Sequence, residues 1–326
     1  MKTILPCILL AMLIIAIAAI LAAYICFSMV FKKPKRKALG KDEYDLPPGE
    51  IYEPYYPQMK HWVDQIRSMD RELMEITSFD GLKLRGYYYE YSPDSPLELI
   101  FHGYGGNAER DLSGGVDRCF ALGRSVILID QRSAGMSEGK ICSFGINERR
   151  DCLAWIDFAN KKFGKERPII IGGISMGAAT VMMASGESLP ENVVCVMADC
   201  GYSSQKEIIK KVIKDMKLPA NLIYPFVKLG GRIFGGFDLE ETSPIEAVAR
   251  SKTPIVYIHG DTDDFVPFYM SVKCYEATKS PKKLVTIESA GHGLAFPVNQ
   301  EKYVNSLRDF ENEVGFLKNK KSGTQI

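Results

Sequence analysis

The chain of 326 residues has few of the residues that metal and redox sites require. It holds four histidines, with neither an HExxH motif nor paired histidine spacing. Its eight cysteines form no CxxC pair, and most lie in apolar runs, where a thiol is typically a small buried hydrophobe. A GxxxxGK[ST] phosphate-binding loop is also absent. These absences argue against metal-dependent hydrolysis, disulfide scaffolding and nucleotide binding.

The chain also lacks a charge excess of either sign. Its 41 basic and 40 acidic side chains give a formal net charge of +1, so no global field would hold a nucleic-acid backbone. The 46% hydrophobic and 25% charged residues are ordinary for a globular protein and exclude collagen, a pure coiled coil and wholesale disorder. We expect no nucleic-acid partner.

A long apolar run opens the chain. Residues 4–31 are 28 residues without a charge, which as a helix would be about 42 Å long, more than the roughly 30 Å of a bilayer's hydrocarbon core. We therefore predict a transmembrane anchor over residues 1–31. A cleavable signal peptide is the alternative, because Ala16-Ile17-Ala18 resembles a cleavage site, although the apolar run continues well beyond it.

A basic flank and a proline-rich linker, residues 32–57, follow the anchor. Only one lysine precedes the apolar run, whereas five basic residues follow it, and this bias predicts a cytoplasmic catalytic domain in a single-pass membrane protein, with an extracellular domain as the alternative. The flank also fits a stop-transfer signal that touches anionic head groups without any recognition role. Its basic residues are Lys32, Lys33, Lys35, Arg36 and Lys37. Pro47-Pro48-Gly49 and Pro54 to Pro57 predict an extended spacer.

The remaining residues, 58–320, show the pattern of an α/β domain. Helical spacing joins Trp62, Ile66, Met69 and Leu73, and Asp80-Gly81 predicts a hairpin between two strands. Short apolar runs then alternate with longer amphipathic stretches, which predicts a parallel sheet with helices on both faces. The predicted strands cover residues 76–79, 82–91, 97–101, 125–129, 168–174, 193–198, 254–258 and 283–287, and two of the predicted helices residues 147–163 and 176–187.

The motif Gly173-Ile174-Ser175-Met176-Gly177 carries the first chemical signal. An apolar run precedes it and a helix-compatible segment follows, which is the strand–turn–helix context of a nucleophile elbow. The glycines let a strained turn pack tightly, so that the Ser175 hydroxyl would project above the sheet edge. The start of the following helix would direct its positive dipole end towards the same point.

A serine hydroxyl needs a base and an acid, which should follow it in the order acid, then histidine. His292, after the last predicted strand, is the predicted base. Asp263 is the predicted acid, because it lies centrally in the loop after the preceding strand. The alternatives are Asp261 and Asp264, which suit turn or cap roles, and the more distant Asp199.

An oxyanion hole is expected from two backbone amides. Met176 follows the nucleophile, and Tyr104 lies in the glycine-containing loop after an earlier strand. Gly105-Gly106 is equally compatible with entry into a helix capped by Asn107.

The region from about residue 75 to residue 316 resembles the α/β-hydrolase superfamily and is most similar to its single-domain bacterial branch with an N-terminal membrane segment. The resemblance implies an eight-stranded, mostly parallel sheet, a Ser175/His292/Asp263 triad, esterase-type chemistry, and neither metal nor organic cofactor. The blocks that carry it are Ser78 to Gly81, His102 to Tyr104, Asp130 to Arg132, Gly173 to Gly177, Ala198 to Tyr202, His259 to Asp263 and Gly291-His292.

Two segments depart from the simplest pattern. After Asp130-Gln131-Arg132, Ser133 stands where relatives commonly have glycine, which affects the loop at the pocket rim. An insertion over about residues 201–250 is where a helical lid lies in this fold. Phe226 and Phe234 within it would line an acyl pocket, but ordinary packing on the sheet or contact with the bilayer beside the anchor fit equally.

The sequence therefore predicts a membrane-anchored serine hydrolase that cleaves small-molecule carboxylic esters or thioesters through an acyl-enzyme. A peptidase of the prolyl-oligopeptidase-like type is the nearest alternative; such enzymes usually carry a further selectivity domain, for which the residues before the sheet are too few. A non-catalytic, membrane-anchored binding module is the alternative from another class. No motif specifies an oligomeric state.

Overall fold

The computed structural model describes residues 4–33, 40 and 43–315. Lys35, Arg36 and Lys37 of the predicted basic flank, and the predicted end of the domain at residue 320, lie outside the described residues.

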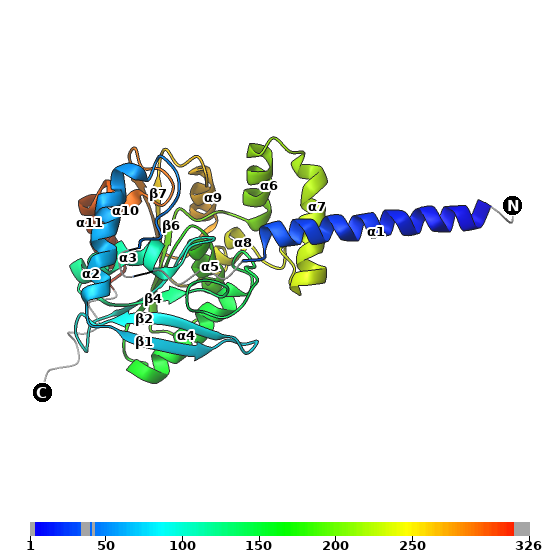
Figure 1. The fold of residues 1–326 in the computed structure, drawn as a ribbon. Helices are drawn as coiled ribbons and strands as arrows, with labels where there is room; N and C mark the ends of the chain where they lie inside the picture. Colours follow the sequence, from blue (N-terminus) through cyan, green and yellow to red (C-terminus); the bar gives the residue numbers. More distant parts are fainter. Residues whose placement is uncertain (1–3, 34–39, 41–42, 316–326) are drawn as a thin grey trace, which may run out of the picture.

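Within the described residues, eight strands form one sheet in the order β1-β2-β4-β3-β5-β6-β7-β8 (Figure 1). β1 and β2 form an antiparallel hairpin, β2 pairs antiparallel with β4, and the remaining neighbours are parallel. The strands are β1 (Glu72–Thr77), β2 (Lys83–Tyr89), β3 (Leu97–Phe101), β4 (Ser125–Asp130), β5 (Ile169–Ile174), β6 (Val193–Asp199), β7 (Ile255–Gly260) and β8 (Lys282–Ile287).

Helices cover both faces of the sheet, because successive side chains of its strands point to opposite sides. In β3, Leu97, Leu99 and Phe101 pack with α4 and α5, whereas Ile100 packs with α3 on the other face. Helices α2 and α11 complete that second face. The helices are α1 (Ile4–Val30), η1 (Glu53–Tyr55), α2 (Tyr56–Ser68), α3 (Ala108–Ala121), α4 (Glu148–Phe163), α5 (Met176–Ser185), α6 (Gln205–Asp215), α7 (Ala220–Gly230), η2 (Gly231–Gly235), α8 (Pro244–Val248), α9 (Tyr269–Ala277), α10 (Ala295–Val298) and α11 (Gln300–Val314).

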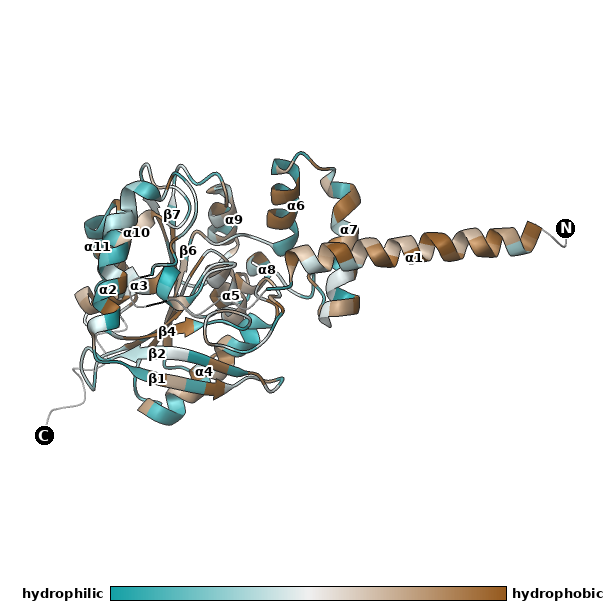
Figure 2. Ribbon diagram, viewed as in Figure 1, coloured by the Kyte–Doolittle hydropathy of each residue, from teal (hydrophilic) through white to brown (hydrophobic). Residues whose placement is uncertain are grey.

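The apolar run forms a single helix, α1, that extends away from the sheet domain (Figure 1). Figure 2 shows that it is hydrophobic along most of its length, and its large side chains from Ile4 to Tyr24 are exposed. Only the last part packs on the domain, where Ala23, Phe27 and Phe31 are buried. There α7 comes so close that a Cβ on Gly230 would lie 2.4 Å from the Ala23 carbonyl oxygen. One end of α1 therefore packs against the domain, and the rest is not covered by any of the residues that the structure describes.

The structure corrects the predicted boundaries before the sheet. The helix α2 ends at Ser68, and Leu73 lies in β1 with 49% of its surface exposed, not on the helix. The first strand ends at Thr77, because Asp80 and Gly81 form the turn and Gly81 adopts a φ of +89°. The hydrophobic spacing of Leu73 matched the helical face only by coincidence.

Candidate active site

Ser175 occupies a sharp turn between the carboxyl end of β5 and the start of α5. Its φ of 55° is unusual for a non-glycine residue, and such a conformation costs about 1–3 kcal/mol unless the surroundings enforce it. The two flanking glycines supply the space for the turn. A Cβ on Gly177 would lie 1.9 Å from the Phe101 carbonyl oxygen, and one on Gly173 would lie 2.2 Å from the carbonyl carbon of Gly177. The turn is the strand–elbow–helix unit that the motif predicts.

His292 and Asp263 lie beside Ser175 in a continuous hydrogen-bonded chain. The Ser175 Oγ is 2.9 Å from His292 Nε2, and His292 Nδ1 is 2.7 Å from Asp263 Oδ2. The three residues come from the loops after β5, β7 and β8, which end at the same edge of a parallel sheet. The structure thus brings together the three predicted residues in the predicted order.

The Asp263 carboxylate is buried and accepts hydrogen bonds on both oxygens. Its Oδ1 accepts from the amides of Phe265, at 3.0 Å, and Val266, at 2.8 Å. Burial by itself would raise the pKa of Asp263, but hydrogen bonds from His259 and His292 outweigh it and lower the pKa to about 2. The carboxylate is therefore ionised at neutral pH and favours the His292 tautomer that carries its proton on Nδ1, leaving Nε2 to accept from the serine.

A second histidine, His259, supports the same carboxylate. It is fully buried at the end of β7, with Nε2 3.2 Å from Asp263 Oδ2 and 2.8 Å from the Val266 carbonyl oxygen. Its Nδ1 lies 2.7 Å from the Ser271 hydroxyl. Sequence reasoning assigned His259 no role beyond ending a strand. Its spacing of four residues from Asp263 was the available signal.

The alternative acids have other partners. Asp261 accepts the Ser289 amide at 2.7 Å, and Asp199 accepts the Tyr303 hydroxyl at 2.8 Å deep in the core. Asp264 is exposed. Of the four aspartates considered, Asp263 is the one bonded to His292.

The predicted oxyanion loop passes directly over the elbow. A Cβ on Gly103 would lie 3.5 Å from Ser175 Cβ, and the Gly103 amide donates to Asp111 Oδ2 at 3.1 Å. Tyr104 follows in this loop, and Met176 begins α5, so its amide has no intrahelical acceptor. Asn107 caps α3 by accepting the Arg110 amide at 2.9 Å. The loop therefore serves as a helix entry beside the elbow.

The side chain of Tyr104 ties this loop to the end of α1. Its hydroxyl donates to the Val30 carbonyl oxygen at 2.7 Å, and its ring packs 4.8 Å from that of Phe144. Phe144 in turn contacts Phe31 at 5.9 Å. The apolar helix and the loop above Ser175 are thus joined by one hydrogen bond and a run of aromatic contacts.

A cavity of about 640 Å³ opens beside Ser175 and His292 and is lined mostly by apolar atoms. It extends between the sheet and the helices α2 and α3, past Trp62 and Phe296, to Tyr303. Residues 47–52 of the predicted spacer also line it, and a Cβ on Gly291 would lie 3.5 Å from Ile51 Cδ1. The segment expected to be a tether therefore forms a wall of the cavity.

Phe226 and Phe234 are not among the residues that line this cavity. Phe234 instead packs against α1, with ring centroids 5.2 Å from Tyr24 and 5.7 Å from Phe27. The structure does not bring the two phenylalanines to Ser175, because α7 turns towards the apolar helix.

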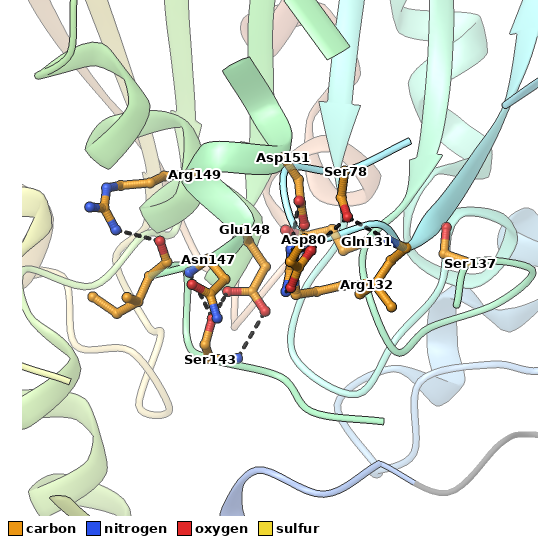
Figure 3. Close-up of polar contacts among 12 residues, drawn as sticks. Ser78, Asp80, Gln131, Arg132, Ser137, Ser143, Asn147, Glu148, Arg149 and Asp151 are labelled. Carbon is orange, nitrogen blue, oxygen red and sulfur yellow. Dashed lines mark hydrogen bonds and ion pairs between the residues drawn. The ribbon is translucent and has the colours of Figure 1, made fainter. Parts of the chain in front are cut away.

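The loop after β4 adopts a left-handed backbone conformation at Ser133, the position where relatives commonly have glycine. Ser133 adopts a φ of 65° without being glycine. Arg132 braces the loop by pairing with Asp151 at 2.6 Å and with Asp80 at 3.0 Å (Figure 3). Nearby, the Glu148 carboxylate accepts the Ser143 hydroxyl at 2.5 Å. Glycine would adopt this turn without strain, whereas Ser133 is strained in it, and the ion pairs of Arg132 hold the turn in place.

One cluster has the composition of a metal site. Single ligand atoms of Cys200, Asp263 and His292 lie within 4.8 Å of one another. However, Asp263 and His292 are already bonded to each other, and burial raises the pKa of the Cys200 thiol well above its usual value. Because two of the three side chains are engaged with each other, the cluster fits hydrogen bonding better than metal coordination.

Comparison with known proteins gives the following matches. The family model described as "alpha/beta hydrolase fold" matches residues 99–227. YqkD of Bacillus subtilis, an uncharacterized protein, is 24% identical over 300 residues, covering 91% of this chain and 96% of YqkD. YNL320W of Saccharomyces cerevisiae, an uncharacterized membrane protein, is 24% identical over 197 residues, covering 60% of this chain and 63% of its own.

A solved structure has the same architecture. The Pyrococcus furiosus esterase Pf2001 superposes with a TM-score of 0.64 at 21% identity, covering 87% of this chain and 98% of the esterase.

Proposed function

Because the chain has the alpha/beta hydrolase fold, we propose that it is a serine hydrolase that cleaves carboxylic esters or thioesters through an acyl-enzyme. The observation that carries the proposal is the hydrogen-bonded chain from the Ser175 hydroxyl through His292 to Asp263. The esterase name of the structural neighbour agrees with it.

In the proposed reaction, Ser175 Oγ attacks the acyl carbon while His292 Nε2 takes its proton. The amides of Met176 and Tyr104 stabilise the oxyanion, and His292 returns the proton to the leaving alcohol or thiol. Water, activated by the same imidazole, then attacks the acyl-enzyme and releases the acid. Asp263 keeps the imidazole in the required tautomer throughout, and His259 positions Asp263.

Labelling with a fluorophosphonate probe tests the nucleophile. The wild type should become labelled on Ser175, and Ser175→Ala should lose both labelling and ester turnover while it stays folded. Ser68→Ala, which changes an exposed serine at the end of α2, is the matched control and should keep both. Retained turnover in Ser175→Ala would refute the proposal, and an unlabelled, inactive wild type would favour a binding module.

The cavity supports a small acyl substrate. Its volume of about 640 Å³ lies within the roughly 300–1,000 Å³ typical of small-molecule sites, and its apolar lining suits a hydrocarbon chain or ring. A series of p-nitrophenyl esters of increasing chain length, run beside p-nitroanilides of short peptides, distinguishes the two hydrolase hypotheses. Turnover of the anilides but not of the esters would favour the peptidase.

We further propose that α1 anchors the protein in a membrane, with the catalytic domain on the cytoplasmic side. The exposed apolar surface of this 27-residue helix supports the anchor, as does the membrane designation of the yeast relative. The basic residues that follow α1 support the orientation. Intact N-terminal mass in the alkali-washed membrane fraction would confirm an uncleaved anchor, whereas loss of the first residues would indicate a signal peptide.

A further inference from the structure

The insertion helix α7 carries an exposed apolar stripe. Leu222 is 65% exposed, Phe226 and Leu229 are half-buried, and Ile233 in the following η2 turn is 51% exposed. Spacings of four, three and four residues place these side chains on one side of a helix. Large apolar side chains gathered on one side of a surface helix indicate a contact with an apolar partner.

The other sides of α7 already have partners. Tyr224 and Val227 are buried against the domain, and Gly230 meets α1 at Ala23. At about 100° per residue, the stripe lies on the side opposite Tyr224 and Val227 and next to the side that meets α1. It therefore faces away from the catalytic domain and borders the apolar helix. The remaining side is polar and carries Asn221, Lys228 and Arg232.

The position of this contact along α1 identifies the partner. About 20 helical residues span the hydrocarbon core of a bilayer, so a span that begins at Ile4 ends near Ala23, where α7 touches α1. Tyr24 follows directly, and tyrosine is enriched at membrane interfaces. Figure 1 shows that α7 runs across α1 and not along it. A helix that crosses the anchor at this level would lie in the plane of the bilayer surface.

We propose that α7 is an interfacial helix that inserts its stripe, Leu222, Phe226, Leu229 and Ile233, into the surface of the same bilayer that α1 spans. This inference rests on the proposed anchor. Exposed Met216 and Leu218, in the turn before α7, extend the apolar surface. Because α7 packs on the domain, its insertion fixes the orientation of the domain on the membrane.

The two cations on the polar side of α7 have acidic partners within the protein. Lys228 pairs with Glu240 at 3.1 Å, and Arg232 pairs with Asp238. These cations are therefore largely compensated within the protein. Exposed Lys217 lies between Met216 and Leu218 and would add attraction to anionic lipid. Because the apolar side chains supply the contact, the insertion should also occur in uncharged phosphatidylcholine.

Tryptophan quenching in full-length protein tests the placement. The protein is reconstituted in two sets of phosphatidylcholine vesicles, whose acyl chains carry bromine near the head groups in one set and near the chain ends, at the depth of Ile14, in the other. The native Trp62 and Trp155 are buried in the domain and give a constant background. Added reporters are Leu222→Trp on the stripe, Asn221→Trp on the polar side of the same helix, and Ile14→Trp within α1. We expect brominated lipid to remove most of the added emission from Leu222→Trp and Ile14→Trp, and little of that from Asn221→Trp.

The three reporters separate the possible failures. Quenching of Ile14→Trp but not of Leu222→Trp would overturn the α7 inference and leave the anchor standing. Absence of quenching at both positions would overturn the anchor and the inference together. A Leu222→Trp emission that is protected from lipid and changes with the protein-to-lipid ratio would show a second copy covering the stripe, which also overturns the inference. None of these outcomes depends on hydrolase activity.

Discussion

The variant Asp263→Asn tests the electrostatic arrangement of the site through both turnover and stability. The amide has nearly the shape of the carboxylate but cannot favour the His292 tautomer that leaves Nε2 free to accept a proton. If the proposed mechanism holds, kcat should fall by about 10⁴, as for other triads that lose this charge. Asp261→Asn, in the same loop, is the matched control, because Asp261 contacts the Ser289 amide and neither histidine.

The stability change has a definite sign with pH. Folding lowers the Asp263 pKa from 3.8 to about 2. Since one pKa unit corresponds to about 1.36 kcal/mol, the ionised carboxylate stabilises the native state by about 2 kcal/mol. That stabilisation is fully present above about pH 4 and is lost as the pH falls through about 2. The free-energy difference between wild type and Asp263→Asn should therefore narrow by about 2 kcal/mol between about pH 5 and about pH 2.

Urea unfolding of the full-length protein in detergent, followed by tryptophan fluorescence at several pH values, measures this difference. A gap between wild type and Asp263→Asn that stays constant over that pH range would refute the assignment of hydrogen bonds from the two histidines. An equal narrowing, over the same pH range, of the stability difference between wild type and the control Asp261→Asn would refute it as well.

Three further variants test the supports of the site and of the fold. Gly177→Ala should destabilise the protein by about 3 kcal/mol in urea unfolding, because its Cβ would lie 1.9 Å from the Phe101 carbonyl oxygen; wild-type stability would show that the elbow relaxes easily. Glu98→Gln should cost about 3–5 kcal/mol in the same assay, since it leaves the buried Arg118 with a neutral partner while Arg124 keeps Glu311, and a loss below about 1 kcal/mol would contradict this. Tyr104→Phe should cost about 1 kcal/mol by removing the hydrogen bond to Val30, and an unchanged thermal midpoint would show that the bond contributes nothing.

The parts of the structure that follow from local rules were predictable from the sequence. The eight-stranded, mostly parallel sheet is confirmed, because alternating short and long apolar segments encode it directly. The elbow at Ser175 could be located since strand, glycines and helix are contiguous. Chain order then placed His292 and Asp263 next to it.

The parts that depend on distant partners were not predictable. Proline-rich segments have no hydrophobic period, so nothing in residues 47–52 indicated that they line the cavity. The amphipathic insertion predicted a helix with an apolar side but not the surface it meets, which is why an acyl pocket, packing on the sheet and bilayer contact all fitted Phe234, which lies against α1. Leu73 fitted a helical period, although it lies in β1 and pairs with Tyr87 of β2.

The burial of Phe27 and Phe31 has a practical consequence for handling the protein. Phe27 belongs to α1 and Phe31 follows it directly, yet both pack among the aromatic side chains of the α/β domain. A shortened chain that begins after the hydrophobic helix would lack these two side chains and would expose the apolar surface that they cover. Such a preparation would tend to aggregate, and its low activity would reflect a damaged domain, whereas detergent or nanodisc samples of the whole chain would keep the domain intact.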